Sequence, residues 1–182
     1  FGVADVSGKG IKSSLLMSKA SSLYRCLSKT IFSSSSLLKI LNDEICETTT
    51  RGMFVTMIVG VYDKNKNELL LSNAGHEPPL IFSKDGNFKT IDEAGPPLGI
   101  APNFKFTEQI ISFKESSMYI FTDGITEMKN NNGEMLGQEG FQDYIKKYQS
   151  TPNNKRLQKM IEDLISSGRI QKDDLTIVTV DG

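Results

Sequence analysis

The sequence lacks tryptophan, contains a single histidine, His76, and has only two cysteines, Cys26 and Cys46. So few cysteines exclude a disulfide-rich secreted scaffold, and neither cysteine has a second cysteine or a histidine at the spacing of a zinc site. We expect two free thiols, although a disulfide between them is compatible with the sequence. A catalytic cysteine would need His76 as its base, and the fold would have to bring that residue in from a distant segment.

An excess of charge of one sign and long apolar runs are also missing. The 182 residues hold 21 Lys and Arg against 22 Asp and Glu, which gives a net charge of −1, and the two signs are interspersed. This balance favours neither nucleic acid nor an anionic membrane surface as a partner. The apolar stretches fall far short of the ~20 residues of a membrane-spanning helix, and the first residues do not resemble a signal peptide. The 38% hydrophobic and 24% charged residues are typical of a globular protein.

Hydrophobic periodicity divides the chain into helical and extended segments. Apolar residues at steps of three and four predict helices from Ile11 to about Leu27, after the serine run 33–36, and across 138–148 and 154–166. We place the serine run in a loop and helix cap. Alternating and β-branched runs predict strands at 1–5, 53–63, 68–72, 80–82, 88–91 and 175–180, with 106–111 and 117–122 as a further strand pair. Paired helices and hairpin-sized strand clusters predict an α+β fold on antiparallel sheet, as one domain over residues 1–182.

Three acidic residues share one placement relative to the predicted strands. Asp5 ends the first strand, Asp123 follows the strand 117–122, and Asp173 precedes the last strand. Taken singly, each acid is better explained by turn chemistry at a strand end. Carboxylates at strand ends can also meet at one edge of a sheet, where their mutual repulsion requires a cation. Ligands that are all oxygen favour Mg²⁺ or Mn²⁺ over zinc.

Seven short motifs follow one another along nearly the whole chain: Ala4-Asp5-Val6-Ser7-Gly8-Lys9-Gly10, Met53-Phe54-Val55-Thr56, Asn73-Ala74-Gly75-His76-Glu77-Pro78-Pro79, Gly95-Pro96-Pro97-Leu98-Gly99, Thr122-Asp123-Gly124-Ile125-Thr126-Glu127, Asn132-Gly133-Glu134 and Asp173-Asp174-Leu175-Thr176. Their order resembles the metal-dependent protein phosphatase family (PPM, protein phosphatase 2C-like), in its bacterial SpoIIE and RsbU branch. Each motif alone is weak, whereas the ordered series is specific. The resemblance implies an α-β-β-α sandwich of two mainly antiparallel sheets flanked by helices. It also implies a hydrolase that removes phosphate from phosphoserine or phosphothreonine on a protein.

The resemblance further implies roles for individual residues. Asp5 corresponds to the carboxylate that bridges two metal ions, and Val6 to a carbonyl ligand of the second ion. Asp123 and Asp173 correspond to the remaining ligands of the first ion. Two Mn²⁺ or Mg²⁺ ions would make a bridging hydroxide available near neutral pH, so a Ser/His/Asp or cysteine nucleophile is not expected.

Four other residues lie within these motifs. Asp174 stands where many relatives have Asn, and we place it and Gly124 beside the ligands rather than among them. Lys9, in the glycine turn, is either a substrate-binding residue that attracts the phosphate together with amides at the helix start, or a solvated turn lysine. We expect His76 to hold a tight loop by hydrogen bonds rather than to take part in catalysis.

The chain also departs from the family pattern. The family's Gly-Gly-Asp segment, whose acid supports the metals through water, would precede Phe1, and Ser7 and Lys9 occupy the turn where animal relatives carry a leaving-group histidine. We therefore expect an N-terminally truncated domain with a weakly held second ion and an open strand edge that favours a homodimer. From the branch we expect an upstream sensor or regulatory domain. We also expect a cytoplasmic location for this domain, even where it belongs to a larger, membrane-anchored protein. The expected partner is a phosphorylated protein substrate such as an anti-anti-sigma factor, in a pathway of sigma-factor regulation.

Other functions fit the residues less well. Gly8-Lys9-Gly10 fails the P-loop pattern, because Val3 stands at the position of its first glycine, and Ser13 replaces the third glycine of a dinucleotide site. A metal-dependent nuclease would need a basic groove, which the slightly acidic composition disfavours. The strongest alternative is a catalytically weak phosphatase-fold module that acts by binding a partner. The three retained aspartates argue against it, since such a module has no need of mutually repelling acids.

Overall fold

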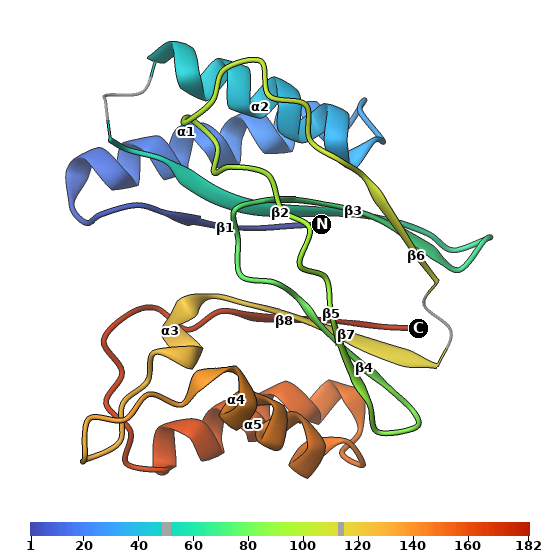
Figure 1. The fold of residues 1–182 in the computed structure, drawn as a ribbon, viewed down its shortest axis with the longest axis vertical. Helices are drawn as coiled ribbons and strands as arrows, with labels where there is room; N and C mark the ends of the chain where they lie inside the picture. Colours follow the sequence, from blue (N-terminus) through green and yellow to red (C-terminus); the bar gives the residue numbers. More distant parts are fainter. Residues whose placement is uncertain (49–51, 113–114) are drawn as a thin grey trace. The chain divides into compact units, whose positions relative to one another are not determined.

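The computed structural model describes residues 1–48, 52–112 and 115–182, and the chain packs as two compact units. The first unit comprises Phe1–Pro78 and Asp92–Lys114, and the second comprises Pro79–Ile91 and Glu115–Gly182. Each unit contains one four-stranded antiparallel sheet with helices packed on it (Figure 1). None of the described helices has both the length and the apolar character needed to span a lipid bilayer.

The sheet of the first unit has the strand order β1-β2-β3-β6. Its strands are, in chain order, Gly2–Val6 (β1), Val55–Asp63 (β2), Glu68–Ala74 (β3) and Gln109–Ser112 (β6). All neighbouring strands are antiparallel, and β1 lies at an edge, where Asp5 pairs with Thr56 and Val6 with Val55. Asp5 therefore lies near the end of β1, as the sequence predicted.

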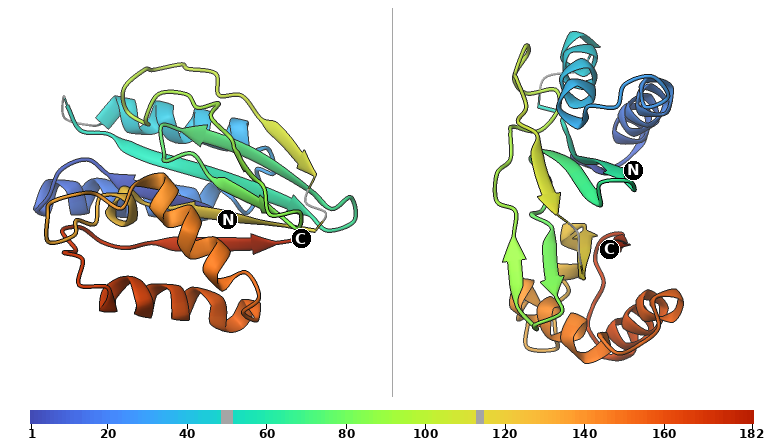
Figure 2. Two further views of the ribbon diagram at one scale, coloured as in Figure 1. Left: turned by 60° about the horizontal axis from the view of Figure 1, so that its bottom comes forward. Right: turned by 90° about the vertical axis from the view of Figure 1, so that its right-hand side faces the viewer.

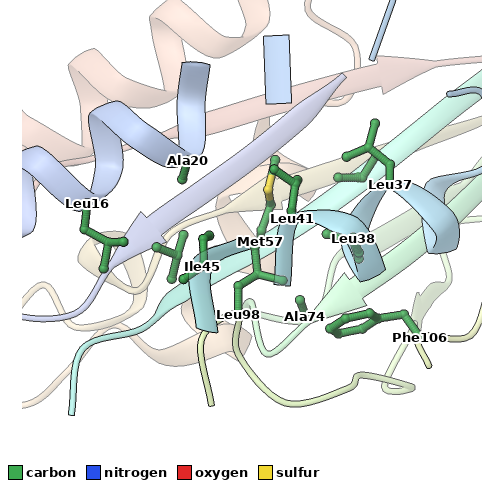
Figure 3. Close-up of a cluster of buried hydrophobic side chains, with 12 residues drawn as sticks. Leu16, Ala20, Leu37, Leu38, Leu41, Ile45, Met57, Ala74, Leu98 and Phe106 are labelled. Atoms are coloured by element: carbon green, nitrogen blue, oxygen red, sulfur yellow. The ribbon is translucent and has the colours of Figure 1, made fainter. Parts of the chain in front are cut away.

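Two helices, α1 (Ile11–Leu27) and α2 (Ser34–Thr48), cover one face of this sheet (Figure 2). Leu41 and Ile45 of α2 pack with Met57 of β2, and Leu98 from a later loop lies among the same side chains (Figure 3). On β1, Ala4 and Val6 pack against this core. Because successive side chains of a strand point to opposite faces, Asp5 points away from the helices.

The start of α2 lies inside the serine run and is capped by a distant acid. The Glu108 carboxylate accepts hydrogen bonds from Ser34 Oγ at 2.8 Å, Ser33 Oγ at 3.1 Å and the Ser35 N–H at 3.3 Å. Burial by itself would raise the pKa of Glu108, but these hydrogen bonds hold it below its ordinary value. An acid at this end satisfies a free backbone donor of the helix and complements its dipole. The run therefore supplies the first helical turn as well as the predicted cap.

The sheet of the second unit has the strand order β5-β4-β7-β8. Its elements are β4 (Leu80–Ser83), β5 (Phe88–Thr90), β7 (Ser116–Phe121), α3 (Asp123–Thr126), α4 (Gly137–Tyr148), α5 (Asn153–Ser166) and β8 (Ile177–Asp181). Tyr119 and Phe121 of β7 pack against Phe141 of α4 and against Met160 and Leu164 of α5. Arg156 ties α5 to both β7 and β8, because it donates to Tyr119 Oη and Asp181 Oδ1, each at 3.1 Å.

One predicted strand pairing is wrong. The segments 106–111 and 117–122 were expected to pair, but β6 pairs with β3 in the first sheet and β7 pairs with β4 and β8 in the second. In β6, half-buried and exposed residues alternate, as suits a sheet edge, whereas the last four residues of β7 are all buried. A strand buried on both faces takes a central position. The other predicted elements are confirmed to within a few residues, and α3 was not predicted.

A fully buried asparagine on α2 holds the loop that borders the start of β2. Asn42 Nδ2 donates to the Ala101 carbonyl at 2.8 Å, and Asn42 Oδ1 accepts from the Gly99 N–H at 3.1 Å. The same loop places Leu98 opposite Val55, with backbone hydrogen bonds of 2.8 Å and 3.1 Å between the two residues. Asn42 therefore acts through the loop on the strand end that pairs with Val6 of β1.

We expect Asn42→Leu to lower the free energy of unfolding by about 2–4 kcal/mol, because it leaves the Gly99 N–H and the Ala101 carbonyl without their buried partner. Urea unfolding measures this loss. Lys39→Met is the matched control on the same helix, since it removes only the partly exposed Lys39–Asp43 ion pair and should cost less than about 1 kcal/mol. Equal losses for the two variants would contradict the role given to Asn42.

Candidate metal centre

In the first unit, Asp5 is an exposed residue at the end of β1, and its Oδ1 accepts the Val6 N–H at 2.9 Å. Two hydrogen bonds fix the residues that follow: the Ser7 N–H donates to the Phe54 carbonyl at 2.9 Å, and the Phe54 N–H donates to Ser7 Oγ at 2.8 Å. Ser13 Oγ on α1 donates to the Ser7 carbonyl at 3.0 Å. The turn after Asp5 is thus held by both β2 and α1.

The glycines of this turn have backbone angles that other residues rarely adopt, with φ of 78° at Gly8 and 91° at Gly10. Gly10 precedes the first residue of α1, and none of the described side chains forms a hydrogen-bonded cap there. Lys9 is exposed between the two glycines. The turn therefore presents a cation next to backbone donors at a helix start.

In the second unit, Asp123 is the half-buried first residue of α3, directly after β7. The preceding residue, Thr122, binds the segment that leads into β8 through three hydrogen bonds. The Thr122 N–H donates to the Thr176 carbonyl at 3.2 Å, Thr122 Oγ1 donates to the Asp174 carbonyl at 3.3 Å, and the Thr176 N–H donates to Thr122 Oγ1 at 3.2 Å. These bonds hold residues 174–176 beside the start of α3.

Gly124 permits a very close approach of that segment. A Cβ atom at Gly124 would lie 2.2 Å from the Asp174 carbonyl oxygen and 3.5 Å from the carbonyl carbon of Asp173. Asp173 is exposed, and its Oδ1 accepts the Asp174 N–H at 3.0 Å, the same local arrangement as at Asp5. The backbones that carry Asp123 and Asp173 are therefore adjacent, although 50 residues separate them in the sequence.

The predicted ligands are divided between the units, with Asp5 and Val6 in the first and Asp123 and Asp173 in the second. Across the described ranges 1–48, 52–112 and 115–182, no group of three or more His, Cys, Asp or Glu side chains is arranged to hold a metal ion. The convergence of Asp5 with the other two carboxylates stays a prediction. The donors are all carboxylate or carbonyl oxygens, and this set fits a hard divalent ion.

The two thiols are free, as predicted. Cys26 is exposed, whereas Cys46 is half-buried and its Sγ lies 3.6 Å from Asn42 Oδ1. Burial raises the pKa of the Cys46 thiol, so it stays protonated near neutral pH. A protonated thiol is a poor nucleophile, which disfavours a cysteine-based reaction at this residue.

His76 lies in a hydrogen-bonded loop, as predicted. The Asn73 side chain binds its backbone on both sides: Asn73 Nδ2 donates to the His76 carbonyl at 3.0 Å, and the His76 N–H donates to Asn73 Oδ1 at 2.8 Å. The roles of the Ser7, Thr56 and Thr122 hydroxyls were not predicted from the sequence, although all three residues lie in the seven motifs. For Ser7 and Thr122 the available signal was their position next to Val6 and Asp123, whereas the motif of Thr56 contains no candidate ligand.

The solved structures that this chain resembles include phosphatase domains of the PP2C type. The chain matches the SiaA-PP2C domain of Pseudomonas aeruginosa with a TM-score of 0.85 and 15% identity, over 100% of this chain and 74% of that one. It matches the catalytic domain of the serine/threonine phosphatase PstP, in complex with 2 manganese ions, with a TM-score of 0.71 and 14% identity, over 99% and 86% of the two chains. The predicted α+β fold of two antiparallel sheets flanked by helices is confirmed.

Within this class, the chain belongs to the family described as Stage II sporulation protein E (SpoIIE), whose model matches residues 1–181. The phosphoserine phosphatase RsbU of Bacillus subtilis (strain 168) is 29% identical over 181 residues, which are 98% of this chain and 54% of that protein. Protein IcfG of Synechocystis sp. is 31% identical over 147 residues, 79% of this chain and 23% of that protein. The chain thus spans about half the length of RsbU and less of IcfG. The predicted membership of the SpoIIE and RsbU branch is confirmed.

We expect Gly124→Ala to be destabilised by about 1–3 kcal/mol, because the added methyl group collides with the Asp174 backbone, which cannot rotate away. Gly140→Ala is the matched control: its Cβ meets the side chain of Leu136, and an alanine inside α4 gains helix propensity. Thermal and urea unfolding of both variants measure the difference. Equal stability of the two variants would contradict the close approach at Gly124.

Proposed function

We propose that this chain is the catalytic domain of a metal-dependent protein phosphatase that hydrolyses phosphoserine or phosphothreonine on a protein substrate. The observation that carries the proposal is the packing of Asp173–Asp174 directly against Asp123–Gly124, on a PP2C-type fold. This packing brings the backbones of two proposed oxygen ligands, Asp123 and Asp173, close together at a strand end. The alternative, a module that only binds a partner, has no need for two acidic segments packed this closely together.

Two Mn²⁺ or Mg²⁺ ions are the proposed cofactors, and the manganese ions of PstP support this choice. Asp5, the Val6 carbonyl, Asp123 and Asp173 would hold them. When bound, such ions lower the pKa of water and neutralise charge on the phosphoryl oxygens. The chain itself orients two of these groups, because the carboxylates of Asp5 and Asp173 each accept the N–H of the next residue.

Lys9 and the turn around it are the proposed contact for the substrate phosphate. The exposed ammonium group would attract the dianion, and backbone N–H groups at the start of α1 can donate to its oxygens. Gly124 and Asp174 would act beside the ligands, by setting the distance between the two acidic segments.

We further propose a cytoplasmic signalling role in which an upstream regulatory domain controls this unit. RsbU, which this chain matches along 54% of that protein's length, supports a longer protein. The proposed substrate class is a small phosphorylated regulator such as an anti-anti-sigma factor.

With p-nitrophenyl phosphate as substrate, we expect turnover to require Mn²⁺ or Mg²⁺ and to vanish in excess EDTA. Asp123→Asn should lower turnover at least about 100-fold, because it removes a charged metal ligand. Asp143→Asn is the matched control, since Asp143 is exposed on α4, and it should leave turnover unchanged. Circular dichroism checks that both variants fold. Full turnover in EDTA, or equal turnover of the two variants, would contradict the proposed function.

The edge position of β1 generates a second expectation. An exposed strand edge pairs readily with further chain, so residues upstream of β1 would extend this sheet. We expect a chain lengthened upstream to bind the second Mn²⁺ ion more tightly than the 182-residue chain and to form fewer dimers. Mn²⁺ titration and light scattering on both chains measure these properties. If the two chains have the same Mn²⁺ affinity and the same solution mass, the upstream residues are dispensable.

A further inference from the structure

Three residues form a row across one end of the first sheet: Asp5 at the end of β1, Thr56 near the start of β2 and His76 just after β3 (strands in Figure 1). Thr56 Oγ1 lies 3.1 Å from His76 Nδ1 and donates to the Asp5 carbonyl oxygen at 3.4 Å. Thr56 is half-buried and His76 is only 5% exposed. The threonine hydroxyl therefore links a buried imidazole to the backbone of a predicted metal ligand.

The imidazole position is fixed from outside this row. Asn73 holds the His76 backbone through two hydrogen bonds, of 2.8 Å and 3.0 Å. Gly75 has a φ of 69°, and a Cβ there would lie 2.7–2.9 Å from the ring of Pro97. The loop 73–76 is thus restrained by its own hydrogen bonds and by close packing, without any contribution from Asp5.

The peptide group between Asp5 and Val6 is restrained on both sides. Its carbonyl oxygen accepts the Thr56 hydroxyl, and its N–H, that of Val6, donates to Asp5 Oδ1 at 2.9 Å. A rotation of this peptide would move the N–H that orients the carboxylate and would also displace the Val6 carbonyl. The Thr56 hydroxyl consequently acts on both proposed ligands of β1.

The hydroxyl has a single hydrogen, so it can donate to only one of its two neighbours at a time. When Thr56 donates to the Asp5 carbonyl, its oxygen can only accept from His76, so Nδ1 carries a hydrogen. Hydrogen bonds in such a chain polarise one another, which strengthens the contact to the carbonyl.

We propose that Thr56 and His76 are positioning residues of the metal centre. They form a two-step hydrogen-bonded relay that fixes the Asp5–Val6 peptide and thereby tightens metal binding. This inference rests on the proposed function. It assigns to the loop histidine a task beyond holding its own loop, and it does not make either residue a catalytic group.

The first test compares Thr56→Val, which keeps the shape of the side chain and removes the hydroxyl, with Thr56→Ser, which keeps the hydroxyl. Mn²⁺ binding to the intact chain is measured by the electron paramagnetic resonance signal of free Mn²⁺, and turnover of p-nitrophenyl phosphate is measured across a Mn²⁺ titration. We expect Thr56→Val to raise the Mn²⁺ concentration for half-saturation about tenfold in both measurements. Turnover at saturating Mn²⁺ should fall less than about threefold, and Thr56→Ser should stay within about twofold of the unaltered chain.

The second test uses the histidine and a double variant. His76→Asn retains an N–H donor near the position of Nδ1, so it should weaken Mn²⁺ binding less than His76→Leu. The effects of Thr56→Val and His76→Leu should not add, because each one breaks the same relay. Thr179→Val, a half-buried threonine on β8, is the control for loss of a strand hydroxyl and should leave Mn²⁺ binding unchanged.

The outcomes separate this inference from the proposed function. Mn²⁺ affinity of Thr56→Val equal to that of the unaltered chain, or equal losses for Thr56→Val and Thr56→Ser, overturns the relay while leaving the phosphatase intact. Additive losses in the double variant overturn the coupling between the two residues. If Thr56→Val melts at a much lower temperature than the unaltered chain, the comparison of His76→Asn with His76→Leu tests the relay instead. An unaltered chain that neither binds Mn²⁺ nor turns over substrate overturns the proposed function, and the relay with it.

Discussion

The register between β1 and β2 is the constraint on which the candidate site in the first unit depends. Ala4 and Val6 pack against the core under α1 and α2, so Asp5 points to the other face. A slip of one residue would reverse these faces and bury the carboxylate among apolar side chains. The paired hydrogen bonds between Ser7 and Phe54 oppose such a slip, and the Leu98 bridge to Val55 holds β2 from the other side. The register is therefore fixed by contacts from three separate segments.

The two units hold their acidic residues with similar hydrogen bonds. In each, a threonine hydroxyl next to a strand end donates to the backbone carbonyl of an acidic residue, Thr56 to Asp5 and Thr122 to Asp174. In each, an exposed acid accepts the N–H of the residue that follows it. Short-range hydrogen bonds can hold a carboxylate in place without the apolar packing that would make its charge costly. This arrangement leaves the carboxylates of Asp5 and Asp173 exposed, as the proposed metal binding requires.

Acidic residues at strand ends would allow the protein to combine a conventional core with the proposed metal site. The side chains that stabilise each unit lie under the helices, for example Leu41 and Met57 in the first and Phe121 and Phe141 in the second. Repulsion between the acids is then a local cost, which bound divalent ions would offset. The proposed metal site would then be separate from the scaffold, which has the PP2C-type fold and belongs to the SpoIIE family.

The sequence by itself determined the types of most elements, the ordered motifs and the candidate acidic ligands, because periodicity and turn chemistry are local properties of the chain. It also determined the family, through motifs such as Thr122-Asp123-Gly124. Only the tertiary structure decided that β6 and β7 belong to different sheets, that Asp174 packs on Gly124, and that Thr56 links His76 to Asp5. The physical reason is distance along the chain: Thr56 and Asp5 are 51 residues apart, and Ser34 and its cap Glu108 are 74 apart. Local patterns carry no record of such partners, which are selected when the strands and helices pack.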